Sequence, residues 1–176
     1  MWPPELETVR AAMAGDRNAS TAILTEGHPR VVAFLIGIGL DRHSADEVAA
    51  ETAEAVVKSI GRIRSPVAFE AWFWAIARNR LRNFYRSRRR ISPTEALISP
   101  ATPEELSVEK EEHRQILAAL WQLPLRDREL LWLREVEGLE YEEISARFGA
   151  REGTVRVAIH RAKKRLEDIY LRDERR

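Results

Sequence analysis

Residues 78–90 hold seven arginines in thirteen positions and no acidic side chain. If most of this segment belongs to a helix over residues 67–88, the arginines recur along one surface, because residues three or four apart are neighbours on a helix. Such a row can neutralise successive phosphates, and interleaved aromatic rings can stack on unpaired bases. The side chains expected to face a single-stranded nucleic acid are Trp74, Arg78, Asn79, Arg82, Asn83 and Arg86.

The opposite side of this helix is apolar, which suits a core. Its expected core residues are Phe69, Trp72, Phe73, Ile76 and Ala77. The alternative interpretation is a solvated basic helix end whose aromatic residues all belong to the core. The density of arginine favours the nucleic-acid interpretation.

A second basic stretch, residues 153–166, follows a short helical segment at 141–148 and the turn residue Gly149. This order predicts a helix-turn-helix, in which the second helix enters the major groove. The predicted apolar seam consists of Ile144, Phe148, Val155, Ile159, Ala162 and Leu166. The residues predicted to contact DNA are Thr154, Arg156, Val157, His160, Arg161, Lys163 and Lys164. Arginine can donate two hydrogen bonds to guanine, which gives base specificity. The alternative is an ordinary helical hairpin with a charged face.

Acidic residues gather on a different segment. Ser44-Ala45-Asp46-Glu47 has the pattern of a capping box, and predicts a helix that begins there and runs to about Ile60. Glu47, Glu51 and Glu54 share one face of it. This face would repel DNA but suit a basic protein surface. The alternative is that these acids only solvate the helix and favour its N-terminus.

The same sequence argues against several other kinds of site. There is no Cys, and the four His have no metal-ligand spacing, so we predict neither a disulfide nor a metal site. No glycine-rich phosphate loop or nucleophile elbow occurs, so we expect no cofactor and no enzyme activity. The longest apolar run, residues 31–40, is about half of what a bilayer requires. Together with the lack of a secretory signal pattern, this predicts a cytoplasmic protein without membrane insertion.

Helical periodicity over most of the 176 residues predicts an all-α fold. A Pro- and Ser-containing stretch without periodicity divides it, so we expect two small helical domains, residues 1–90 and 113–176, joined by a flexible linker at 91–112. In the first domain we expect a helix over residues 18–40, broken near Gly27-His28-Pro29. The net charge of +1 does not exclude DNA binding, because the location of the charge matters more than its sum.

The order of these motifs resembles the extracytoplasmic-function (ECF) group of bacterial sigma factors, group 4 of the sigma-70 family. These are promoter-specificity subunits of RNA polymerase. The resemblance is carried by four segments, residues 44–52, 69–80, 123–144 and 153–162. It implies a first domain that binds and melts the −10 element and a second, the helix-turn-helix, that binds the −35 element. It also implies that the linker threads through the polymerase active cleft, and that the chain is held silent by an anti-sigma factor.

The resemblance also implies roles for particular residues. The acidic helix would dock on the clamp of the largest polymerase subunit, and the second domain on the flap of the second-largest. The clamp-binding residues would be Asp46, Glu47, Glu51, Thr52 and Glu54. Asn79 and the loop Ile63-Arg64-Ser65 would lie near a flipped non-template base, which must be held outside the stack to be read.

Departures from the family pattern suggest where this chain differs. Ala50 and Ala53 stand where the family commonly has Gln and a bulky apolar residue, which would weaken docking or shift it to neighbouring contacts. Val157-Ala158 stands in place of a frequent Ser-Arg, so the −35 sequence is expected to differ. The leading hypothesis is a promoter-specificity subunit of RNA polymerase. A free-standing helix-turn-helix regulator and a nucleic-acid enzyme such as a nuclease are the alternatives.

Overall fold

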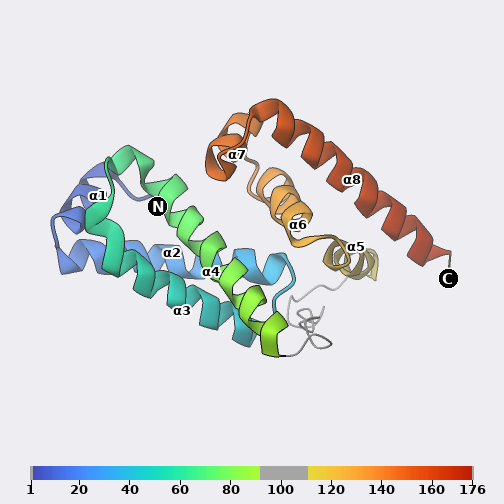
Figure 1. The fold of residues 1–176 in the computed structure, drawn as a ribbon, viewed down its shortest axis with the longest axis horizontal. Coiled ribbons are helices and arrows are strands. Elements are labelled where there is room, and N and C mark those ends of the chain that lie inside the picture. Colours follow the sequence, from blue (N-terminus) through green and yellow to red (C-terminus); the bar gives the residue numbers. More distant parts are fainter. Residues whose placement is uncertain (1, 92–110, 176) are drawn as a thin grey trace. The chain divides into compact units, whose positions relative to one another are not determined.

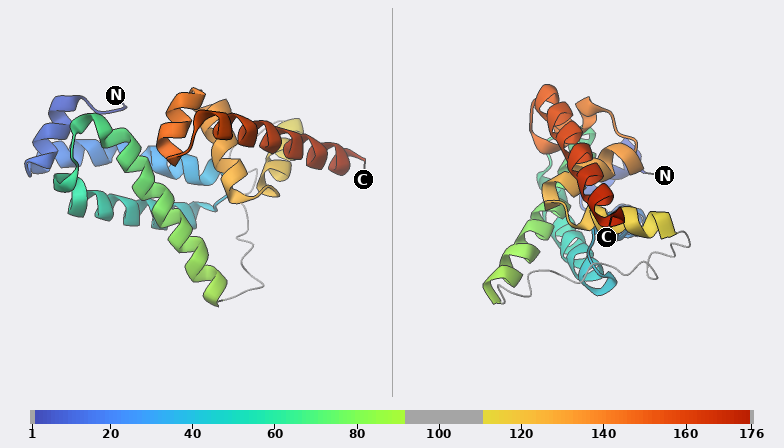
Figure 2. Two further views of the ribbon diagram at one scale, coloured as in Figure 1. Left: turned by 45° about the horizontal axis from the view of Figure 1, so that its top comes forward. Right: turned by 90° about the vertical axis from the view of Figure 1, so that its right-hand side faces the viewer.

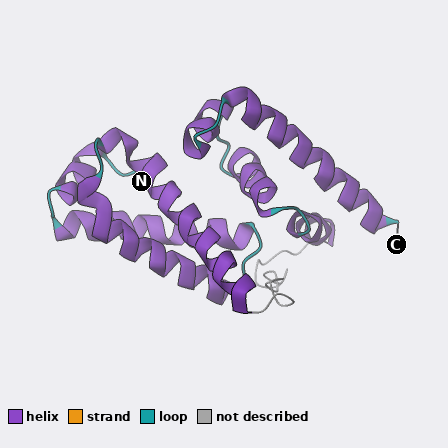
Figure 3. Cartoon of the chain, viewed as in Figure 1, coloured by secondary structure: helices purple, strands orange, loops and turns teal. Residues whose placement is uncertain are grey.

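The computed structural model describes residues 2–91 and 111–175. Every regular element in these two ranges is a helix and none is a strand (Figure 3), which confirms the predicted all-α fold. The chain divides into two compact units, Met1–Ala33 with Arg42–Ile98 and Phe34–Asp41 with Ser99–Arg176. Most of the linker predicted at residues 91–112 lies outside the described residues. The flexible linker and the domain boundaries therefore stay predictions.

The first unit is built on two long helices that pack side by side, α3 and α4 (Figure 1). A short N-terminal helix contacts the two 3-10 turns between them. The elements in chain order are α1 (Leu6–Met13), α2 (Arg17–Gly37), α3 (Arg42–Ser59), η1 (Ile60–Arg62), η2 (Pro66–Ala68) and α4 (Phe69–Ile91). The last four residues of α2, from Phe34 on, are counted with the second unit. The basic segment of residues 78–90 therefore lies on a helix, as predicted.

The break predicted near Gly27-His28-Pro29 is wrong, because α2 runs through all three residues. Gly27 allows aromatic rings to pack closely against α2 and does not form a turn. A Cβ atom at Gly27 would lie 2.9 Å from Cζ of Phe73 and 3.0 Å from Cζ3 of Trp2. The aromatic rings approach the helix backbone at this point, and their burial offsets the poor helix propensity of Gly and Pro.

The capping box predicted at Ser44 is also wrong. α3 begins two residues earlier, at Arg42, and Ser44 is buried within its first turn. Ser44 and Ala45 continue the inward face that Val48 and Ala49 occupy one turn later. The first turn therefore follows the apolar periodicity of the whole helix. A local motif was outweighed by burial of the face.

The second unit contains the predicted helix-turn-helix. Its elements are α5 (Glu111–Trp121), α6 (Leu125–Leu131), the π-helical turn η3 (Trp132–Val136), α7 (Tyr141–Phe148) and α8 (Glu152–Glu174). α7 lies at the N-terminal end of α8 (Figures 1 and 2). The buried core consists of Leu123, Leu130, Leu131, Leu133, Ile144, Val155, Ile159 and Ala162, with Phe148 and Leu166 packed against it. The predicted seam is thus confirmed.

Local signals explain the sharp turn between α7 and α8. Gly149 ends α7 with φ of 60°, a left-handed conformation that glycine adopts without strain. At the other end of α7, the backbone N–H of Glu140 donates to the carboxylate of Glu143 at 2.7 Å. Glu143 thus satisfies a backbone N–H group at the N-terminus of α7. Within the described ranges, no helix has the length and apolar character needed to cross a membrane.

Candidate nucleic-acid interface

The two faces of α8 differ sharply. Val155, Ile159 and Ala162 point into the core and are almost fully buried. The residues predicted to contact DNA are all exposed, namely Thr154, Arg156, Val157, His160, Arg161, Lys163 and Lys164. The structure therefore brings this whole predicted group to one open surface. Such a surface can offer guanidinium groups to base edges and ammonium groups to phosphates.

Two side chains of the second unit contact the guanidinium group of Arg156. Its Nη2 lies 2.7 Å from Oε1 of Glu152, one turn earlier on α8. Its guanidinium also stacks 4.2 Å from the ring centre of Tyr141, the first residue of α7. Arg134 is a second basic neighbour of that ring, and its guanidinium lies 4.6 Å from the same centre. Tyr141 was missed from sequence, since nothing local links it to Arg156.

Acidic side chains from η3 and α6 approach α8 as well. Glu135 accepts from Lys163 at 2.8 Å, and Asp127 accepts from Arg165 at 2.5 Å. Asp127 is buried, so its ion pair ties the start of α6 to α8. These pairs orient Lys163 and Arg165 and partly neutralise them, so Arg161 and Lys164, which neighbour them on α8, are the less neutralised groups.

Two open grooves flank the exposed face of α8. The first, with a volume of about 500 Å³, is lined by Arg126 and Asp127 of α6 and by Gly153, Thr154, Val157, Ala158, Arg161 and Arg165 of α8. The second is lined by Tyr141 and by Arg156, Val157, Ile159, His160, Arg161 and Lys163. Val157 and Arg161 border both. Arg126 and Arg165 were not predicted as site residues.

On α4, the predicted basic face is wrong in part. Trp74 and Arg78 are only 3% and 5% exposed, because they extend the buried stripe formed by Phe73, Ala77 and Leu81. They cannot contact DNA in this packing. Asn79, Arg82 and Arg86 are exposed, as predicted. Asn83 is half-buried, and its Oδ1 accepts from Nη2 of Arg86 at 2.6 Å.

The loop between η1 and η2 also differs from expectation. Ile63 is buried, so its side chain belongs to the core and not to a base-reading surface. Arg64 is exposed and Ser65 is half-buried. Val67 lies directly after this loop, in η2; it is an apolar side chain that is 77% exposed, and it was not predicted. Arg64 of the loop and Val67 of η2 are therefore the exposed side chains of this segment.

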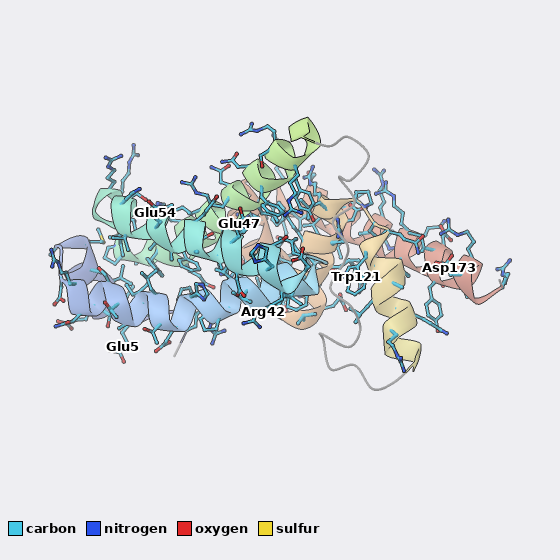
Figure 4. The ribbon with its side chains drawn as sticks, turned by 90° about the horizontal axis from the view of Figure 1, so that it is seen from below. Glu5, Arg42, Glu47, Glu54, Trp121 and Asp173 are labelled. Atoms are coloured by element: carbon cyan, nitrogen blue, oxygen red, sulfur yellow. The ribbon has the colours of Figure 1, made fainter. Side chains whose placement is uncertain are left out.

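The acidic side chains predicted to share one face of α3 are exposed, but one of the predicted docking residues is buried. Glu47, Glu51 and Glu54 are exposed along the helix, where Figure 4 labels the first and last of them. Thr52 is only 1% exposed, and its hydroxyl donates to the carbonyl of Val48 at 2.8 Å. It therefore cannot contact a docking partner, because its face of α3 turns inward.

Two of the acids near this face are paired within α3. Asp46 accepts from Arg42 at 3.0 Å. Lys58 hydrogen-bonds Glu54, which lowers the pKa of that carboxyl group. In the part of the chain that the structure describes, no group of three or more His, Asp or Glu side chains could hold a metal ion.

Comparison with known proteins gives the family. Residues 23–91 match sigma-70 region 2, and residues 113–166 match sigma-70 region 4. The ECF RNA polymerase sigma factor SigD of Mycobacterium tuberculosis is 36% identical over 171 residues, covering 91% of this chain and 81% of SigD. The chain belongs to the ECF sigma factors. The sigma factor CarQ of Myxococcus xanthus is 29% identical over 158 residues, covering 88% of this chain and 91% of CarQ.

Solved structures agree on the fold of this sigma factor. CnrH, in complex with the cytosolic domain of CnrY, has a TM-score of 0.70 at 20% identity, with 96% of this chain and 97% of that chain covered. RpoE of Bartonella quintana, in complex with the anti-sigma factor NepR, has a TM-score of 0.68 at 22% identity, with coverage of 85% and 94%. The family is one of transcription initiation factors, which confirms the leading hypothesis.

Proposed function

We propose that this sigma factor reads the −35 element of its promoters with the exposed face of α8. The observation that carries this proposal is the row of exposed basic side chains on a well-packed helix-turn-helix, with Arg156 oriented by Glu152 and Tyr141. Arg156 and Arg161 are the base readers, because guanidinium groups recognise guanine through two hydrogen bonds. Lys164 binds phosphate, which fixes the register.

The first unit binds the −10 element through the exposed part of α4 and the neighbouring loop. Asn79, Arg82 and Arg86 are exposed on α4, and Arg64 on the loop. Arginines on one surface suit the phosphates of a melted strand, and an amide can hydrogen-bond the edge of a base outside the stack. Trp74 and Arg78 have no part in this contact because they are buried.

The acidic face of α3 docks on the clamp of the largest subunit of core polymerase, with Glu47 and Glu51 as its main charges. The second unit contacts the flap of the second-largest subunit. A protein with these partners works in the cytoplasm, where polymerase and promoter DNA are found. An anti-sigma factor is a further partner, and this is supported by the relatives CnrH and RpoE, whose structures contain CnrY and the anti-sigma factor NepR.

The decisive experiment is reconstitution with bacterial core polymerase. The purified chain is mixed with core enzyme, and transcription is measured from a library of randomised promoters. A stable complex and a shared −35/−10 pattern among the transcripts support the proposal. Failure to bind core enzyme, together with specific binding of duplex DNA by the chain alone, would instead favour a free-standing regulator.

Point variants then test the residues. Arg156→Ala and Arg161→Ala should each cost about 1–3 kcal/mol of binding at one base pair of the −35 element. Arg175→Ala removes an exposed arginine beyond α8 and serves as the matched control. An equal loss for every −35 sequence would make Arg156 and Arg161 phosphate contacts only. Asn79→Ala should leave −35 binding intact and impair promoter opening, and normal opening would exclude its role.

A further inference from the structure

Val157 is an apolar side chain in the middle of a surface otherwise fitted for polar contacts. It is 50% exposed and borders both grooves of α8. Thr154 and Ala158 lie next to it, at helical spacings of three and one, and line the first groove with it. Together, the valine and alanine side chains and the methyl group of Thr154 form a small apolar patch on the face that we assign to DNA.

The major groove offers few partners to such a patch. Base edges present hydrogen-bond donors and acceptors there, and the one apolar group among them is the C5 methyl of thymine. A valine opposite a cytosine would cover the polar N4 amino group without replacing its hydrogen bond, which costs free energy. Val157 therefore favours a T·A pair over a C·G pair at the position that it faces.

Cations around the patch suit a DNA backbone. Arg126 and Arg165 line the first groove, and Arg165 is held by its ion pair with the buried carboxylate of Asp127. Lys164, which we assign to a phosphate contact, is exposed on the same helix about two turns after Val157. Phosphate contacts on either side fix the distance between helix and base edges, so the valine meets the same base pair in every complex.

We propose that Val157 is a specificity-determining residue that reads the C5 methyl group of one thymine in the −35 element, within about two base pairs of the guanine that Arg156 reads. This inference rests on the proposed −35 function of α8. It adds the chemical class of the base contact, which is an apolar contact with a methyl group.

The test removes only that methyl group. In a promoter obtained from the library, each thymine of the −35 element is replaced in turn by uracil, on either strand, and binding by the holoenzyme is measured. At one position the affinity should fall about four-fold, the factor expected for loss of one buried methyl-sized group. In holoenzyme carrying Val157→Ala, the same replacement should have almost no effect.

Leu171→Ala provides the matched control, since Leu171 is an exposed apolar residue of α8 outside both grooves. The holoenzyme with this change should keep the full uracil penalty. The inference is overturned if wild-type holoenzyme tolerates uracil at every thymine, if the −35 element contains no thymine on either strand, or if the penalty persists in Val157→Ala. A holoenzyme with no −35 preference at all would instead overturn the proposed function of α8.

Discussion

The guanidinium of Arg156 stacks 4.2 Å from the ring centre of Tyr141, so an aromatic side chain of α7 positions the main predicted base reader of α8. Glu152 holds the same guanidinium from the preceding turn, at 2.7 Å. A flexible arginine loses side-chain entropy when it binds a base. Because Tyr141 and Glu152 already restrict Arg156 in the folded protein, less entropy is lost on binding. We therefore predict that Tyr141 is a positioning residue for Arg156 in DNA recognition.

Replacing the ring tests this role. Tyr141→Leu keeps an apolar side chain against the core but removes the cation–π contact, so discrimination at the base pair read by Arg156 should fall by a factor of about 2 to 5. Tyr141→Phe keeps the ring and should bind like wild type. The measurement is affinity of the holoenzyme for promoters with each base at that pair. In an Arg156→Ala background, Tyr141→Leu should cause no further loss; a loss of equal size there would mean that Tyr141 acts elsewhere.

Arg78 and Arg82 lie one turn apart on α4 and should behave in opposite ways. Arg78 is buried, so Arg78→Ala removes a packed side chain and should lower the free energy of unfolding by about 1–3 kcal/mol. Arg82 is exposed, so Arg82→Ala should leave stability within about 0.5 kcal/mol of wild type and reduce promoter opening. Unfolding in urea measures the stability of each variant, and an assay of promoter opening by the holoenzyme measures its effect on DNA melting. A stable Arg78→Ala variant that binds DNA poorly would restore Arg78 to the interface.

Gly27 tests the packing of the first unit. The added Cβ of Gly27→Ala would lie 2.9 Å from Cζ of Phe73 and 3.0 Å from Cζ3 of Trp2, so the rings must shift. The expected loss is about 1–3 kcal/mol of unfolding free energy, despite the better helix propensity of alanine. Gly153→Ala is the control, since its Cβ would meet nothing within 4 Å. Greater stability of Gly27→Ala would show that the rings yield without cost.

The sequence predicted the second unit better than the first for a physical reason. On α8 the apolar residues recur with clean helical spacing among charged ones, so Val155, Ile159 and Ala162 could only point inward. On α4, aromatic residues occur on both sides of the helix, and the spacing alone did not show how wide the buried stripe is. Its width depends on α3, which packs along α4, and this is why Trp74 and Arg78 were assigned to the wrong face.

The spacing of residues within one helix could not predict the contacts between helices. Asp127 and Arg165 are 38 positions apart, and their ion pair exists only because α6 packs on α8. The contact of Tyr141 with Arg156 is of the same kind. Residue types and periodicity therefore predicted the helix-turn-helix and the exposed side chains of α8. The residues that orient them, and the grooves beside them, required the fold.

The acidic face of α3 gives a last prediction, which separates polymerase docking from DNA binding. Glu51 is exposed, and no cation in the described ranges pairs with it, whereas Glu54 is already partnered by Lys58. Glu51→Lys should therefore weaken binding to core polymerase about three- to ten-fold, and more strongly at low salt, because the reversed charge repels a basic docking surface. Glu54→Lys should repel that surface too, but it also breaks the pair with Lys58, so it is the less informative variant.

Glu7→Lys makes the same change in net charge on an exposed position of α1 and serves as the control. Affinity for core polymerase is measured at several salt concentrations, and binding of −35 duplex by each assembled holoenzyme is measured in parallel. Glu51→Lys holoenzyme, once saturated with the variant, should bind the −35 element normally, because the acidic face and α8 belong to different units. Equal weakening of core binding by Glu7→Lys would mean that net charge, and not the acidic face of α3, governs docking.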